Sequence, residues 1–118
     1  MKIIGNGIDI IEIERIEAAV KRHPRLLLGA FTDTEREHFA LKNNSFATIA
    51  GCFAAKEAVV KALGTGFSGI MPRDVCISWD DKGKPMASVS KVGGRVHFFT
   101  SISHSKKYAV ASVIAFEE

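Results

Sequence analysis

The chain has 118 residues, of which 47% are apolar and 25% are charged, so its length and composition fit one ordinary globular domain spanning 1–118. Its formal net charge of +3 favours an anionic partner, which could be nucleic acid, a phosphorylated small molecule or an acidic protein. The aromatic residues are mostly Phe and are not interleaved with Lys and Arg, which disfavours a stacking platform for nucleic-acid bases.

The apolar start Ile3-Ile4 soon reaches Asp9, so we expect no secretory signal, and no apolar run is long enough to cross a bilayer. Cys52 and Cys76 are too far apart for a zinc pattern and too few for a disulfide framework. We therefore expect a soluble cytoplasmic protein with two reduced thiols in or near its core. A domain this small also gains buried surface by forming oligomers.

The first half of the chain predicts one strand and three helices. Residues 2–10 are rich in Ile and Gly and predict a buried strand that ends near Asp9. From Ile11 the apolar residues recur at helical spacing, and Pro24 should end that helix at about residue 23. Thr32-Asp33-Thr34-Glu35 has the form of a capping box, which predicts a short helix towards residue 41. A longer, Ala-rich helix over 46–63 should stop at Gly64-Thr65-Gly66.

The second half predicts strands. Residues 75–79 and 85–89 should form a hairpin around the turn 80–83. A glycine-rich turn at 91–95 should precede the last two strands, over 96–103 and 108–116. Because helices come early and strands come late, the predicted fold class is α+β.

Three charged residues could form a phosphate and metal site. Asp9 lies where the first strand leads into the first helix, a place that equally suits a helix N-cap, a turn carboxylate or a metal ligand. Glu57 and Lys61 are four residues apart on one helix face, which is also the spacing of a surface ion pair. Their neighbours are apolar or small, so these charges could instead face a cleft or an interface. Magnesium commonly binds one or two carboxylates plus substrate phosphates, so the three residues would suit a bound pyrophosphate if the fold brings them together.

Two further segments could bind phosphate. His104 lies between two serines and is followed by two lysines, so it marks either a polar connection or a phosphate-binding corner. The segment 64–66 is either a helix stop or a backbone that lets a phosphate approach, and it lacks the spacing of a P-loop.

A basic stripe follows the first strand. Arg15 and Arg22 are seven residues apart, about 10 Å along one helix face, and Arg25 comes just beyond Pro24. Such a stripe is either a solvated face or a docking surface for an acidic partner.

Taken together, these segments resemble the holo-acyl-carrier-protein synthase family of phosphopantetheinyl transferases. The matching stretches are Gly7-Ile8-Asp9-Ile10 with Glu12 and Arg15, Phe53-Ala54-Ala55-Lys56-Glu57-Ala58 with Lys61, Leu63 and Gly64-Thr65-Gly66, Gly83-Lys84-Pro85, and Ser101-Ile102-Ser103-His104-Ser105. They fall in the family's order and spacing and cover nearly the whole chain. The first stretch alone is a weak signal, but the combination is specific.

The resemblance implies a compact α+β domain that forms homotrimers, with a coenzyme A site at each subunit interface. Asp9 and Glu57 match the family's magnesium carboxylates, and Lys61 matches a lysine that contacts the phosphates and assists the leaving group. Gly64 and His104 match positions that line the nucleotide.

The resemblance also implies partner contacts. Pro85 matches a residue that approaches the adenine from a neighbouring chain. Arg15, Arg22 and Arg25 match basic residues that dock an acidic helix of the carrier protein.

The activity implied by the resemblance is magnesium-dependent transfer of 4′-phosphopantetheine from coenzyme A to a serine of apo-acyl carrier protein, releasing 3′,5′-ADP, in fatty acid biosynthesis. Glu57 is the candidate base for the serine proton, directly or through a bound water. Two alternatives are a non-catalytic module that binds coenzyme A or the carrier, and a basic nucleic-acid binder. Neither needs the paired carboxylates, so both fit the sequence less well.

One position departs from the family pattern. Cys52 stands where the family usually carries an arginine, immediately before the Phe53–Ala58 segment. That arginine is expected to help hold coenzyme A phosphates, so we expect the cysteine to weaken coenzyme A binding.

Overall fold

The computed structural model describes residues 1–118 and places one long strand before the helices and four strands after them. In chain order the elements are β1 (Lys2–Glu12), α1 (Ile13–Arg22), α2 (Leu26–Ala30), α3 (Asp33–Leu41), α4 (Phe46–Leu63), a 3₁₀ turn (Pro72–Asp74), β2 (Val75–Trp79), β3 (Pro85–Val89), β4 (Val96–His104) and β5 (Tyr108–Glu117). The α+β class expected from the sequence is confirmed.

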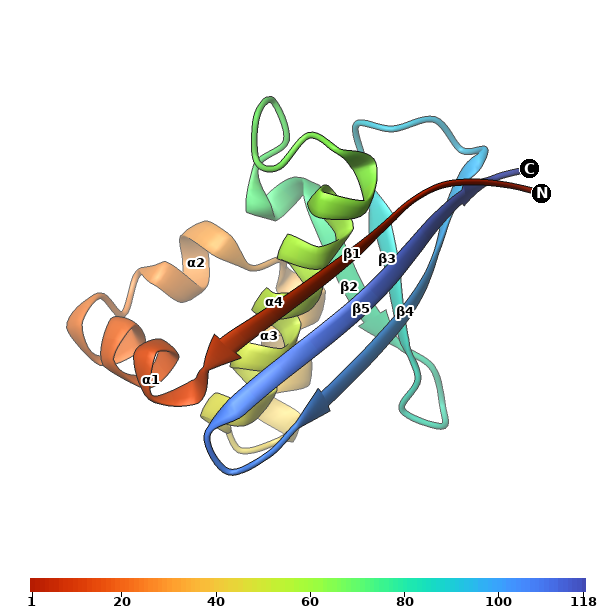
Figure 1. Ribbon diagram of the computed structural model, residues 1–118. Helices are drawn as coiled ribbons and strands as arrows, with labels where there is room; N and C mark the ends of the chain where they lie inside the picture. Colours follow the sequence, from red (N-terminus) through yellow and green to blue (C-terminus); the bar gives the residue numbers. More distant parts are fainter.

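The strands form two antiparallel sheets. One contains three strands in the order β1-β5-β4, and the other is the β2–β3 hairpin. β1 and β5 pair over nearly their whole lengths, from Lys2 opposite Glu117 to Glu12 opposite Tyr108. The two ends of the chain therefore lie side by side at one end of the sheet (Figure 1).

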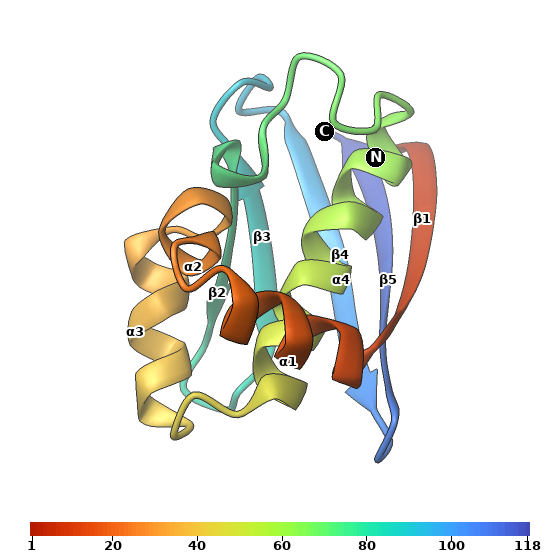
Figure 2. The ribbon, with the colours of Figure 1, turned by 90° about the vertical axis from the view of Figure 1, so that its left-hand side faces the viewer.

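Helix α4 lies at the centre of the molecule. It packs against all three strands of the larger sheet, against β2, and against α1 and α3, and Figure 2 shows it between the two sheets, with α1 crossing in front. Eleven of its 18 residues are buried, which explains why its apolar residues follow no single stripe. No helix of the chain combines the length and the hydropathy that a membrane crossing needs.

Strand β1 differs from the sequence expectation in burial and length. It continues to Glu12, and it is not buried, because it is an edge strand whose outward-facing side chains Ile8 and Ile10 are 63% and 65% exposed. Only Gly7 and Asp9 within it are buried, and both face α4. Helix α2 was not predicted.

Two local predictions about helix ends are confirmed. Thr32 and Glu35 form a reciprocal capping box at the start of α3. Gly64 ends α4 in the left-handed conformation, with φ of 79°.

Glycines let β1 lie directly on the backbone of α4. A Cβ atom added to Gly5 would stand 2.0 Å from the Ala62 carbonyl oxygen, and one added to Gly7 would stand 2.0 Å from that of Ala58. Two strand residues span about 6.7 Å and four helical residues about 6 Å, so the spacing of the glycines matches one turn of the helix. The next inward-facing residue of β1 is Asp9, which this contact brings to the side of α4.

Candidate active site

Asp9 and Lys61 form an ion pair between β1 and α4. Asp9 is 8% exposed, and its Oδ1 accepts a hydrogen bond of 3.0 Å from Lys61 Nζ. The same ammonium donates to the Ile8 carbonyl oxygen, also at 3.0 Å. The structure therefore excludes the N-cap alternative for Asp9, because the residue that caps α1 is Glu12. It also excludes a simple Glu57–Lys61 surface pair, because Lys61 reaches across to β1.

Glu57 lies beside Asp9 on α4 and carries a perturbed carboxyl group. Burial and, after it, the negative charge of Asp9 together raise the pKa of Glu57 to about 7, while Lys61 acts in the opposite direction. Two carboxylates of like charge in a partly desolvated place are a common feature of catalytic and metal sites.

Both carboxylates open into a cleft of about 380 Å³. The cleft is lined by Asp9, Ile10, Ile11, Glu12, Arg15, Ile16, Phe53, Glu57 and Tyr108. These residues come from β1, α1, α4 and the start of β5. The sequence had indicated Asp9, Glu57 and Arg15 as candidates, but not the aromatic wall made by Phe53 and Tyr108.

The donor set fits a hard divalent cation. The Oδ2 atom of Asp9 is buried and has no hydrogen-bond partner, and burial beside Asp9 raises the pKa of Glu57 to about 7. A cation between the two would satisfy the orphaned oxygen and relieve the repulsion. The chain gathers no group of three or more His, Cys, Asp or Glu ligands, and magnesium typically takes one or two carboxylates together with substrate phosphates and water.

The other predicted cofactor-binding residues lie outside this cleft. Gly64 is at the end of α4, where its N–H bonds to the Lys61 carbonyl oxygen. His104 is the exposed last residue of β4, and Pro85 is the first residue of β3. Of these three, Gly64 follows Lys61 by three residues and Glu57 by seven, which is about two helical turns.

Two of the three basic residues, Arg15 and Arg22, line hollows of the surface, and Arg25 does not. Arg15 lines the carboxylate cleft and also borders a second hollow on α1, which it shares with Arg22. Arg25 is the residue before α2 and lines neither of them. The stripe predicted from the sequence is thus continuous between Arg15 and Arg22 only.

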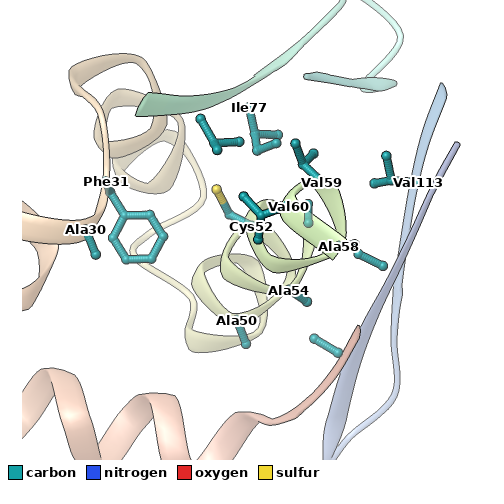
Figure 3. Packing of buried hydrophobic residues seen from close by; sticks show 14 of the residues in the cluster. Ala30, Phe31, Ala50, Cys52, Ala54, Ala58, Val59, Val60, Ile77 and Val113 are labelled. Atoms are coloured by element: carbon teal, nitrogen blue, oxygen red, sulfur yellow. The ribbon is translucent and has the colours of Figure 1, made fainter. Parts of the chain in front are cut away.

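Cys52 lies on the opposite side of α4 from the cleft. It is fully buried, and burial raises the pKa of its thiol well above the ordinary value. In Figure 3 its sulfur lies among core side chains near Phe31 and Ile77, while Ala54 and Ala58 point to the strands. A side chain at this position belongs to the core, so the expected direct role of position 52 in holding phosphate does not fit the geometry.

Comparison with known proteins agrees with the site. The family described as the 4′-phosphopantetheinyl transferase superfamily matches residues 5–113. The chain belongs to this family. Its relatives in the superfamily include the holo-[acyl-carrier-protein] synthase of Halalkalibacterium halodurans, which is 47% identical over 95% of this chain and 94% of that protein. The synthase of Alkaliphilus metalliredigens is also 47% identical, over 96% and 98% of the two chains.

Solved structures of the transferase superfamily share the fold. The holo-(acyl-carrier-protein) synthase of Bacillus anthracis, crystallised in complex with CoA (3′,5′-ADP), has a TM-score of 0.85 and 36% identity over the full length of both chains. The synthase of Helicobacter pylori in complex with coenzyme A has a TM-score of 0.82 and 34% identity, covering 93% of this chain and 98% of that one. The resemblance recognised in the sequence is confirmed.

Proposed function

We propose that this protein transfers the 4′-phosphopantetheine group of coenzyme A to a serine of an apo-acyl carrier protein and releases 3′,5′-ADP. The observation that carries the proposal is the pair of carboxylates, Asp9 and Glu57, that line one cleft, with Lys61 bonded to Asp9, in a member of the transferase superfamily. Relatives that match nearly the whole chain are holo-acyl-carrier-protein synthases, and two similar structures hold coenzyme A or its nucleotide.

The chemistry is a phosphoryl transfer. The serine oxygen attacks the β-phosphorus of coenzyme A, the bond from that phosphorus to the bridging oxygen breaks, and the bridging oxygen leaves with its electron pair on 3′,5′-ADP. Glu57 takes the serine proton, directly or through a bound water, since it is the carboxylate on α4 that lines the cleft. Lys61, held by Asp9 and by the Ile8 carbonyl, offsets negative charge on the phosphates as the bond breaks.

We propose magnesium as the metal, held by Asp9 and Glu57. When bound, it would supply positive charge next to the pyrophosphate oxygens. The role of the chain is to keep the two carboxylates together despite their repulsion, and Lys61 and the close β1–α4 contact do so.

We propose a homotrimer in which each active site lies at a subunit interface. The face of the β1-β5-β4 sheet away from α4 supports association, because its exposed apolar side chains include Ile8, Ile10, Phe99 and Ile114. No helix covers this face in one subunit (Figure 1). Assembly of subunits would also explain how Pro85 and His104, which lie away from the cleft, could take part in one coenzyme A site.

We propose that an acidic carrier protein docks on α1, with Arg15 closest to the carboxylates, Arg22 about two turns further and Arg25 beyond the helix. Charge complementarity of this kind speeds encounter and fixes orientation. Cytoplasmic fatty acid biosynthesis is the setting that this activity and the two free thiols fit.

The test is intact-mass analysis of an apo-acyl carrier protein after incubation with this protein, coenzyme A and magnesium. We expect a mass gain of one phosphopantetheine, abolished by EDTA and by Asp9→Ala or Glu57→Ala, with both variants still folded by circular dichroism. Full activity in either variant would refute the roles of the carboxylates. No transfer by wild type, on a carrier that a reference transferase modifies, would refute the proposed activity, and coenzyme A binding alone would then indicate a non-catalytic module.

A further inference from the structure

A second charged cluster lies on the side of α4 away from the cleft. Lys56 and Glu35 are both fully buried. Lys56 Nζ donates to Glu35 Oε1 at 2.6 Å, to Oε2 at 2.8 Å and to the Val75 carbonyl oxygen at 2.5 Å. Glu35 also accepts from the N–H of Ile77 at 2.6 Å and from that of Thr32 at 2.8 Å. The pair therefore joins α3, α4 and the outer edge of β2 at one point.

Stability alone does not account for this pair. The cost of removing two charges from water is comparable to the attraction between them, so replacing a buried ion pair by apolar residues is often neutral or stabilising. Such a pair fixes the relative orientation of the elements that it joins, because all its hydrogen bonds are satisfied in one arrangement only.

Helix α4 needs a contact that fixes its rotation about its own axis, because mainly small side chains and glycines lie between it and strands β1 and β5. It presents Ala58 and Ala62 to β1, where Gly5 and Gly7 meet them. The inward-facing residues of β5 are Ala109, Ala111, Val113 and Ala115. Small side chains form shallow ridges, which interlock weakly and resist rotation of a helix less than large ones do.

Rotation of α4 would directly affect the cleft. Lys56 and Glu57 are consecutive residues, so they point about 100° apart around the helix. A rotation of about 20° would move a side-chain group about 5–6 Å from the axis by about 2 Å. A shift of 1 Å in reacting groups can cost about 100-fold in rate. Fixing Lys56 against β2 and α3 thus fixes the direction in which Glu57 leaves the helix.

We propose that Glu35 and Lys56 are positioning residues, which hold α4 in the rotation that brings Glu57 to Asp9. This inference rests on the proposed function, since it assigns a role to the pair in the same site. The alternative role is protection of the β2 edge, because Glu35 and Lys56 occupy the backbone groups of Val75 and Ile77 that another strand could otherwise pair with.

The test compares two neutral double variants. Glu35→Gln/Lys56→Met keeps one acceptor oxygen at residue 35, for the N–H of Ile77 or that of Thr32, and removes every hydrogen bond from the side chain of residue 56. Glu35→Gln/Lys56→Gln is the matched control, because it is also uncharged but restores a polar side chain on α4 that can bond to residue 35. The readouts are kcat, KM for the carrier, the magnesium concentration for half-maximal transfer, and the rise in melting temperature that magnesium alone causes.

We expect Glu35→Gln/Lys56→Met to remain folded, to lose at least tenfold in kcat, and to need about tenfold more magnesium in both the transfer and the melting experiments. Its KM for the carrier should stay within twofold of wild type, because the carrier is expected on α1. The control should recover most of the loss. Wild-type transfer measured in parallel tests the proposed function separately.

Two results would overturn the inference while leaving the proposed function in place. One is a folded Glu35→Gln/Lys56→Met variant with wild-type kcat and magnesium dependence, which would leave edge protection as the role of the pair. The other is failure of that variant to fold, which would show that the pair is required for stability and not for orientation.

Discussion

Replacing Gly7 by alanine tests whether the close contact between β1 and α4 assembles the active site. The new Cβ atom would lie 2.0 Å from the Ala58 carbonyl oxygen and 2.8 Å from the Ala62 nitrogen, both of them backbone atoms of a buried helix. Carbon and oxygen need about 3.2 Å, so β1 must move outward by about 1.2 Å.

The movement reaches Asp9, which is two residues along the strand. The Asp9–Lys61 hydrogen bond of 3.0 Å would lengthen to about 4 Å and cease to be one. We expect a fall in kcat of about 100-fold, since misplacement of reacting groups by about 1 Å has costs of that order. Forcing an extra methyl group into a packed contact typically costs about 1–3 kcal/mol of stability, so the variant should remain folded.

Steady-state transfer kinetics and urea unfolding measure the two effects. Gly5→Ala is the matched control, because its Cβ would also lie 2.0 Å from a carbonyl oxygen of α4, that of Ala62, but it is four residues from Asp9. It should lose similar stability and much less activity. A folded Gly7→Ala variant with kcat within twofold of wild type, or equal kinetic losses in the two variants, would refute the reasoning.

Three other outcomes are expected. Because the pKa of Glu57 is about 7 in the folded chain and lower when unfolded, the metal-free folded state binds more protons between about pH 4.5 and 7 and loses stability as pH rises through that window. After allowance for solvent screening, Glu57→Gln should therefore stabilise the metal-free protein by about 1 kcal/mol at pH 8 and not at pH 4.5, and equal urea midpoints at pH 8 would contradict this. Arg22→Glu should raise KM for the carrier roughly tenfold at low salt and leave KM for coenzyme A unchanged. Because Arg15 lines the cleft, Arg15→Glu should alter both KM values. Loss of coenzyme A affinity in Arg22→Glu would contradict the docking assignment. Cys52→Arg should destabilise the protein by at least about 3 kcal/mol in urea unfolding, because it would place a guanidinium in the core. Tighter coenzyme A binding by this variant would show instead that a side chain at position 52 reaches the phosphates.

Sequence reasoning succeeded where the signal is local. The capping box at Thr32 and the glycine stop at Gly64 are chemical requirements of helix ends, and both were confirmed. The alternating strands of the second half were also found close to their actual bounds, because the side-chain period of a strand is visible in the sequence. Helix α2 was missed because five residues, Leu26–Ala30, are too few to show a helical period.

Features that depend on the partner of a residue could not be predicted in the same way. The Ile-rich start predicted a buried strand, but this edge strand is just as apolar and leaves Ile8 and Ile10 exposed. Lys61 was paired in sequence with Glu57 and in space contacts Asp9, 52 residues away. Glu35 satisfied a capping pattern, so nothing marked it as the buried partner of Lys56. The spacing of Gly5 and Gly7 was the one available signal for the β1–α4 contact, since glycines inside a strand often mark close backbone approach.

The pairing of β1 with β5 has a consequence for how the protein is made. β1 leaves the ribosome first, yet its only hydrogen-bonded neighbour in the sheet is β5, which is synthesised after every other element. The sheet pairing of the strand that carries Asp9 is consequently completed only when residues 108–117 have emerged, although Asp9 and Glu57 are both synthesised earlier. A chain that stops before Tyr108 would leave β1 unpaired and its isoleucines exposed, and it would lack one wall of the carboxylate cleft, so the cleft should be completed in a late step of synthesis.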